Sequence, residues 1–234
     1  MRLTRVLIAL VLFGITFGYV EAAVVVYLRA LMAPLREELF PDRPNDELFP
    51  MVRLDDLRAA GPDAMHIFWT ELGREMATMG MLVAAGLAYA RNFREWLAGF
   101  MIAFGVWDIF YYVFLKLLID WPASLGTWDV LFLVPVPWVG PVISPVLVAV
   151  AMIAAGVIIL WREARQRPIR AGALHWAAIF GGGLVLVVAF CWDWRNAAAG
   201  GMPNPFNWPL YWTGAGIGAA GFLHAVVRKP PAAN

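Results

Sequence analysis

Four carboxylates lie inside apolar stretches of this sequence, where acids are uncommon. They are Glu21, Glu71, Glu75 and Asp108. Each stretch is long enough to cross a bilayer, so these side chains are expected at membrane depth. A charge in hydrocarbon costs roughly 2.5 to 3.5 kcal/mol on insertion scales, so such residues usually face the protein interior and serve a function. The four acids are therefore candidates for a site that binds a metal ion or a proton.

Helical periodicity places further polar groups beside these acids. Successive residues are about 100° apart on a helix, which puts Arg74 and Thr78 in the same stripe as Glu71 and Glu75. A helix in lipid needs no polar stripe unless that stripe faces something polar. Two phenols, Tyr111 and Tyr112, follow Asp108 at the third and fourth positions, where they could hydrogen-bond carboxylates. The supporting residues of the predicted site are Arg74, Thr78, Tyr111 and Tyr112.

The balance of charge separates two readings of this cluster. Arg74 is the one base predicted near the four acids, and a guanidinium pairs with one or two carboxylates. A salt-bridge network that only joins three helices therefore accounts for Arg74 and one partner, but not for the remaining acids. Buried acids in excess either hold protons or bind a cation.

The type of cation is open at this point. Oxygen ligands suit calcium, manganese or iron better than copper, so a divalent metal ion is a candidate cofactor. The same acids could instead serve as proton-relay groups in a carrier. The Glu-x-x-His pattern of di-iron helical bundles is absent, which disfavours an oxygenase.

Three histidines are candidates for a second site. His175 and His224 fall near the inner ends of two predicted helices, where they could form a relay. His66 lies about 140° from Glu71 on a regular helix, away from the polar stripe. Histidines at the membrane interface without a chemical role are the alternative for all three.

The elements that position these residues are predicted to be membrane-spanning helices. The composition is 62% hydrophobic and 15% charged with a mean hydropathy of +0.69, which is typical of an all-α integral membrane protein. We expect one polytopic domain over residues 1–234. The predicted spans are Val6–Leu28, His66–Ala90, Trp96–Leu118, Pro141–Trp161, Leu174–Trp194 and Pro209–Val227.

Two connecting segments stand out from this six-helix bundle. The outer loop 33–65 carries more acids than arginines, with a short amphipathic helix predicted at Arg53–Ala60. It is either a solvated cap or an acidic funnel that concentrates cations.

The segment 129–145 contains four prolines, which break a helix interior, so it cannot be one clean span. We predict an interfacial or re-entrant segment before the fourth helix.

Basic residues predict the orientation in the membrane. Ten lie in predicted inner segments, including Arg91, Arg162 and Lys229, and five lie in outer loops. This asymmetry predicts that both termini are cytoplasmic in a bacterial-type plasma (inner) membrane. Val6–Gly18 could pass for a signal peptide, but the apolar run continues to Leu28, which favours a retained helix.

The expected partners follow from composition and glycine spacing. The first partner is the lipid bilayer, and a net charge of +1 gives no reason to expect nucleic acid. Gly181–Gly183 and the Gly214-x3-Gly218 pattern favour close helix contact, within the bundle or with another copy or a larger complex. Cys191 is the single cysteine, so neither an internal disulfide nor a CxxC motif is present.

No familiar catalytic or nucleotide-binding motif occurs in the sequence. The leading hypothesis is a multi-pass protein that binds a cation or proton at the intramembrane acids, in transport. The second is a membrane-embedded enzyme, metal-dependent or not, that acts on a lipophilic substrate. The third is an accessory subunit of a membrane complex.

Overall fold

The computed structural model describes residues 2–43 and 47–228. Lys229, one of the basic residues assigned above to the inner side, lies outside this range, as do residues 44–46 of the acidic loop. The described helices are α1 Arg2–Leu39, α2 Leu54–Ala60, α3 Pro62–Leu87, α4 Phe93–Ile119, α5 Ile143–Ala164, α6 Ala173–Phe190, α7 Trp194–Ala198 and α8 Trp208–Val227. The strands are β1 Trp128–Phe132 and β2 Trp138–Pro141.

Five helical segments are long and apolar enough to cross a membrane. They comprise α1, α4, α5, the segment Ala173–Ala198 with α6 and α7, and α8. The chain is therefore a multi-pass membrane protein, in agreement with its composition. The remaining predicted span, His66–Ala90, corresponds to α3, which has 26 residues but is not among the five. Its apolar sequence is interrupted by Glu71, Arg74 and Glu75.

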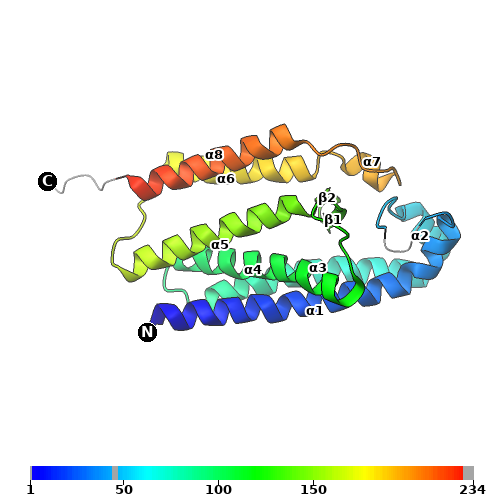
Figure 1. Cartoon of the computed structure of the whole chain (residues 1–234), viewed down its shortest axis with the longest axis horizontal. Coiled ribbons are helices and arrows are strands. Elements are labelled where there is room, and N and C mark those ends of the chain that lie inside the picture. Colours follow the sequence, from blue (N-terminus) through cyan, green and yellow to red (C-terminus); the bar gives the residue numbers. More distant parts are fainter. Residues whose placement is uncertain (1, 44–46, 229–234) are drawn as a thin grey trace.

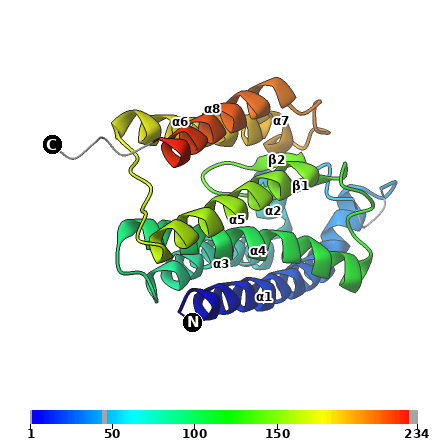
Figure 2. The same ribbon diagram turned by 60° about the vertical axis from the view of Figure 1, so that its left-hand side comes forward.

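The long helices run roughly along one common axis (Figure 1). Helices α6 and α8 lie side by side on one face of the molecule, and α1 lies on the opposite face (Figures 1 and 2). Helix α5 lies between these layers, and α4 packs extensively on both α1 and α5. The described start of α1 and the end of α8 are at the same end of the bundle (Figure 1).

Helix α1 is longer than the sequence indicated. It continues past the predicted end at Leu28 to Leu39, with Pro34 inside it. The added turns bring Arg36 over the following loop, where its guanidinium donates to the Leu48 carbonyl oxygen at 3.2 Å. The outer loop is correspondingly shorter than 33–65. The extension also brings two partly buried arginines, Arg29 and Arg36, to the cavity described below.

The proline-rich segment forms an antiparallel β-hairpin, which the sequence analysis did not foresee. Pairing runs from Trp128 opposite Pro141 to Phe132 opposite Trp138, with a register shift between Val130 and Phe132. The strands contain β-branched and aromatic residues, which favour strands. Of the four prolines, which lack backbone donors, Pro135 and Pro137 lie in the connection, Pro141 ends β2 and Pro145 lies in the first turn of α5. The tip of this hairpin, residues 133–137, reaches the side of α3, as the hydrogen bonds below show.

Helices α6 and α8 approach at their glycines. A Cβ atom on Gly182 would lie 2.5 Å from the Gly218 nitrogen and 2.6 Å from the Gly214 oxygen. The two backbones are therefore closer than any side chain would allow. Gly181, one position away, has no atom within 4 Å of a Cβ built on it. The Gly214-x3-Gly218 pattern thus packs inside the chain.

The α6–α8 pair is tied to the other helices at both of its ends. The Arg162 guanidinium on α5 donates to the Val226 carbonyl oxygen near the end of α8 at 2.8 Å. At the other end the Tyr211 hydroxyl on α8 donates to the Ser144 carbonyl oxygen at 2.9 Å. Strand β2 also contacts both α6 and α7.

A matched pair of substitutions tests the glycine contact. Gly182→Ala should lower the free energy of unfolding by about 1 to 3 kcal/mol, because the new methyl group meets backbone atoms that cannot move alone. Gly181→Ala should be neutral or stabilising, since alanine is the better helix former. Thermal unfolding in detergent measures both, and equal effects would contradict the close packing.

Cysteine labelling tests the predicted orientation. In a Cys191→Ser background, Ala123→Cys lies in the exposed connection after α4 and Arg167→Cys in the exposed connection after α5. With cytoplasmic termini, a membrane-impermeant maleimide added to intact cells should label position 123 and leave position 167 unlabelled. The reverse pattern would show that the orientation is inverted.

Candidate functional site

A cavity of about 680 Å³ lies between α1, α3, α4, α5, the hairpin and the end of α6. Its wall combines charged side chains with many aromatic and aliphatic ones. The charged lining residues are Glu21, Arg29, Arg36, Glu71, Arg74, Glu75, Asp108 and Asp129. All four acids predicted from the sequence line this one cavity, as do Thr78, Tyr111 and Tyr112.

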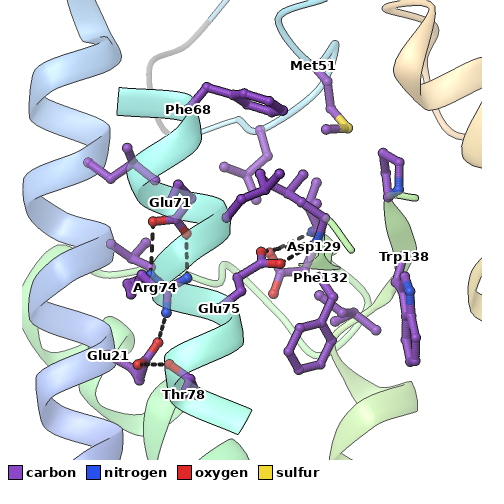
Figure 3. Close-up of a pocket in the computed structure, with 18 of the residues that line it drawn as sticks. Glu21, Met51, Phe68, Glu71, Arg74, Glu75, Thr78, Asp129, Phe132 and Trp138 are labelled. Atoms are coloured by element: carbon purple, nitrogen blue, oxygen red, sulfur yellow. Dashed lines mark hydrogen bonds and ion pairs between the residues drawn. The ribbon is translucent and has the colours of Figure 1, made fainter. Parts of the chain in front are cut away.

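Arg74 joins α1 to α3 through a partly buried ion-pair triad. Its guanidinium forms ion pairs with Glu21 on α1 and with Glu71 one turn away on α3. The Thr78 hydroxyl donates to the other Glu21 oxygen at 2.6 Å. Figure 3 shows Arg74 and Thr78 both directed toward Glu21. The single base predicted for the site therefore neutralises one acid and is shared with a second.

Glu75 points away from this triad, toward the hairpin (Figure 3). Its two carboxylate oxygens accept from the Leu133 N–H at 2.9 and 3.1 Å. Its side chain forms no ion pair with any described residue, although it is only 7% exposed. Glu75 thus anchors the hairpin tip to α3 while its own charge stays uncompensated by a direct cation.

Unlike Glu75, Asp108 on α4 accepts no hydrogen bond from a described backbone N–H. It is 8% exposed, lines the cavity, and forms no hydrogen bond or ion pair with the described residues. The predicted bond from a neighbouring phenol goes elsewhere, because the Tyr112 hydroxyl donates to Asp129 at 2.8 Å. Tyr111 lines the cavity beside it. A carboxylate buried without a partner is costly unless a proton or a ligand neutralises it.

Asp129 is a fifth buried acid that the sequence analysis left out of the site. It lies in β1, accepts from the Val130 N–H at 2.8 Å and is 2% exposed. Burial raises the pKa of Asp129 to about 6, while the Tyr112 hydroxyl and the Arg29 guanidinium act in the opposite direction. Asp129 is the first residue of the apolar, proline-rich segment 129–145, and this position is the feature of the sequence that could have marked it as a site residue.

Two arginines were also missed, for a reason visible in α1. Arg29 and Arg36 line the cavity because α1 continues beyond Leu28. Arg29 and Arg36 are seven residues apart, close to two helical turns, so an extended α1 would have placed both on one face. Arg29 stacks on the Trp121 ring at 4.3 Å, and Arg36 donates to carbonyl oxygens of the outer loop, such as that of Glu47 at 2.6 Å.

The acids do not converge on one point. Glu21 and Glu71 bind Arg74, Glu75 binds the hairpin, and Asp108 stands apart from both. Among the residues that the structure describes, no group of three or more His, Cys, Asp or Glu side chains is close enough to hold a metal ion. The divalent metal considered from the sequence therefore has no multidentate site in the described arrangement.

The histidines separate into a pair and a single residue. The ring nitrogens His175 Nε2 and His224 Nδ1 lie 3.0 Å apart, and the rings stack with centroids 5.1 Å apart. The Gly172 N–H donates to His175 Nδ1 at 3.1 Å, so His175 must donate to His224 through Nε2. This pair joins the start of α6 to the end of α8. His66 is exposed and lines neither the cavity nor this contact.

Comparison with known proteins adds no assignment. No protein-family model, curated protein or solved structure matches the chain.

The triad generates a stability prediction. Arg74→Gln should lower the free energy of unfolding by about 3 to 5 kcal/mol, because Glu21 and Glu71 stay buried without their cation. Adding Glu21→Gln to this variant should recover part of the loss. Arg58→Gln, which breaks an exposed pair with Asp55, should cost less than about 1 kcal/mol.

Unfolding in detergent, followed by circular dichroism, measures these three variants together. If Arg74→Gln proved as mild as Arg58→Gln, the triad would contribute nothing to the junction of α1 and α3.

Proposed function

We propose that this protein is a six-span plasma-membrane protein that binds a cation or a proton at Glu75 and Asp108 and uses this binding in transport. The observation that carries the proposal is that two carboxylates, each more than nine-tenths buried, line one cavity without an ion pair to any described residue. Buried acids of this kind in membrane helices commonly mark ion pathways or proton relays.

The orientation of the side chains on α3 supports its assignment as the sixth span. Met76 and Met81 are 66% and 45% exposed on the side of α3 away from the cavity, where a soluble protein would carry polar residues. Glu75 and Thr78 are buried on the opposite face. Apolar residues outward and polar residues inward is the arrangement expected of a helix surrounded partly by lipid.

We assign the binding role to Glu75 and Asp108 because the other acids of the cavity already interact with arginines. Arg74 is occupied by Glu21 and Glu71, and Arg29 acts on Asp129. Two of the cavity acids are left for a bound proton or cation to neutralise. The acidic residues that precede α3 in the outer loop would raise the concentration of cations near this side of the bundle.

The hairpin links the binding of a proton or cation at Glu75 to the position of other elements. When Glu75 is charged, it holds the Leu133 N–H. A proton or cation on Glu75 weakens this hydrogen bond, because the acceptor loses negative charge. The same hairpin packs on α6 through Trp138 and Phe190, whose ring centroids are 6.3 Å apart. Charge at α3 is thereby linked to the position of the α6–α8 pair.

A membrane-embedded enzyme is the second candidate, favoured by the large aromatic part of the cavity wall, which suits a lipophilic substrate. Asp108 and Asp129 would then act as acid and base. Chemical change of a bound lipophilic compound, rather than its movement, would distinguish this candidate. The role of an accessory subunit predicts co-purification with partners in mild detergent.

Charge displacement on a solid-supported membrane tests the proposal. A pH or cation jump over the reconstituted full chain should give a transient current as the acids bind. Glu75→Gln and Asp108→Asn should each reduce the current, and the double variant should abolish it. Glutamine retains an oxygen acceptor for the Leu133 N–H, so the Glu75→Gln protein should remain folded with equal or higher thermal stability.

The matched control is Asp120→Asn. Asp120 is exposed after the end of α4, has φ of 54°, and does not line the cavity. Asparagine tolerates this backbone conformation, so the same chemical change should leave the current intact. A folded Glu75→Gln/Asp108→Asn protein that gives the full current would overturn the proposal.

A further inference from the structure

We infer that the cavity takes an amphipathic organic cation, whose positive group pairs with Asp108 and whose apolar body lies against an aromatic wall. This inference rests on the proposed function in one respect, namely that Asp108 is charged when the ligand binds. The proposed function leaves the ligand open between a proton, a metal ion and an organic solute. The inference adds the chemical class of this ligand.

The aromatic wall is a continuous series of rings from three parts of the fold. Phe104 and Trp107 on α4 have ring centroids 5.2 Å apart, and Trp107 lies 6.5 Å from Phe132 on β1. Phe132 lies 5.4 Å from Trp138 on β2, which stacks on Phe190 of α6. All five rings line the cavity. Ring faces attract organic cations and also bury apolar ligand surface.

Asp108 supplies the charge at one side of this wall. It follows Trp107 directly in α4, so the acid and the wall share one helix. Its carboxylate lines the cavity and has no hydrogen-bond or ion-pair partner among the described residues. A ligand cation in the cavity would provide the missing positive charge. No rearrangement of an existing ion pair is needed for Asp108 to accept it.

An anionic ligand fits the same cavity poorly. Arg74 is already shared between two carboxylates, and Arg36 is held by carbonyl oxygens of the outer loop. Arg29 stacks on Trp121 and acts on Asp129. A negative group would therefore meet Glu75 and Asp108 without an uncommitted guanidinium to balance them. Like-charge contacts of this kind cost several kcal/mol.

A small ion also fits poorly as the sole ligand. Calcium takes about six to eight oxygen ligands, and the described carboxylates do not gather around one point. The volume of about 680 Å³ lies within the range of sites for drug-sized molecules, roughly 300 to 1,000 Å³. Most of that volume is bounded by apolar side chains, which a hydrated ion would leave unused.

Two probes of matched size and opposite charge test the inference. Tetraphenylphosphonium and tetraphenylborate carry the same four phenyl groups around a positive and a negative centre. Binding to the full chain in phosphatidylcholine nanodiscs is measured by equilibrium dialysis, with partition into empty nanodiscs subtracted. Saturable binding of tetraphenylphosphonium is expected, with much weaker binding of tetraphenylborate. Equal or preferential binding of tetraphenylborate by the unmodified protein would overturn the inference without any variant.

Variants then locate the site. Asp108→Asn should weaken tetraphenylphosphonium binding about tenfold or more, the factor that corresponds to 1.4 kcal/mol. Asp108→Glu should retain most of the binding because it keeps the charge, and Asp120→Asn should retain all of it. Trp138→Leu should weaken binding, whereas Trp212→Leu, an exposed residue outside the cavity, should not. Unchanged binding in folded Asp108→Asn protein would refute the pairing.

The outcomes separate this inference from the proposed function. If the charge displacement depends on Glu75 and Asp108 but tetraphenylphosphonium does not bind, only the ligand class is wrong. If tetraphenylphosphonium binds at Asp108 but the folded double variant gives the full current, the coupled binding of a proton or cation is wrong and the ligand site stands.

Discussion

The Arg74 guanidinium between Glu21 and Glu71 is the interaction on which the arrangement of the site depends. It brings one charged residue of α1 and two of α3 into contact where water is scarce. Direct packing between these two helices is slight compared with that of α1 on α4. This ion pair and the packing of α3 on α4 together fix the rotation of α3 about its axis, and Glu75 is directed to the other side, toward the hairpin (Figure 3).

The helical periodicity of the sequence was sufficient to place Glu71, Arg74, Glu75 and Thr78 on one face, and all four line the cavity. It could not show which acid binds Arg74. That choice depends on how α1 crosses α3, and crossing geometry is set by side chains far apart in the sequence. A count of acids against bases nevertheless indicated that some carboxylates would lack a partner, as Asp108 does.

The parts that sequence reasoning missed arise from contacts between distant segments. Prolines indicated that residues 129–145 were not a helix, but strand pairing needs two segments in register, and Asp129 enters the site only through that pairing. The extension of α1 is supported by hydrogen bonds from Arg36 to the following loop. Without that tertiary support, the span was predicted to end with the apolar run at Leu28.

The charged middle of α3 has a consequence for how the chain is made. Each of the three charged residues would raise the free energy of inserting α3 into the bilayer by roughly 2.5 to 3.5 kcal/mol. Insertion of α3 by itself is therefore unfavourable. Glu21 precedes Arg74 in the chain, so α1 is synthesised first and can supply a neutralising acid as α3 emerges. For an α3 that spans the bilayer, as proposed above, we expect α1 and α3 to insert as a cooperative unit, with the ion pair acting during biogenesis before it serves the finished protein.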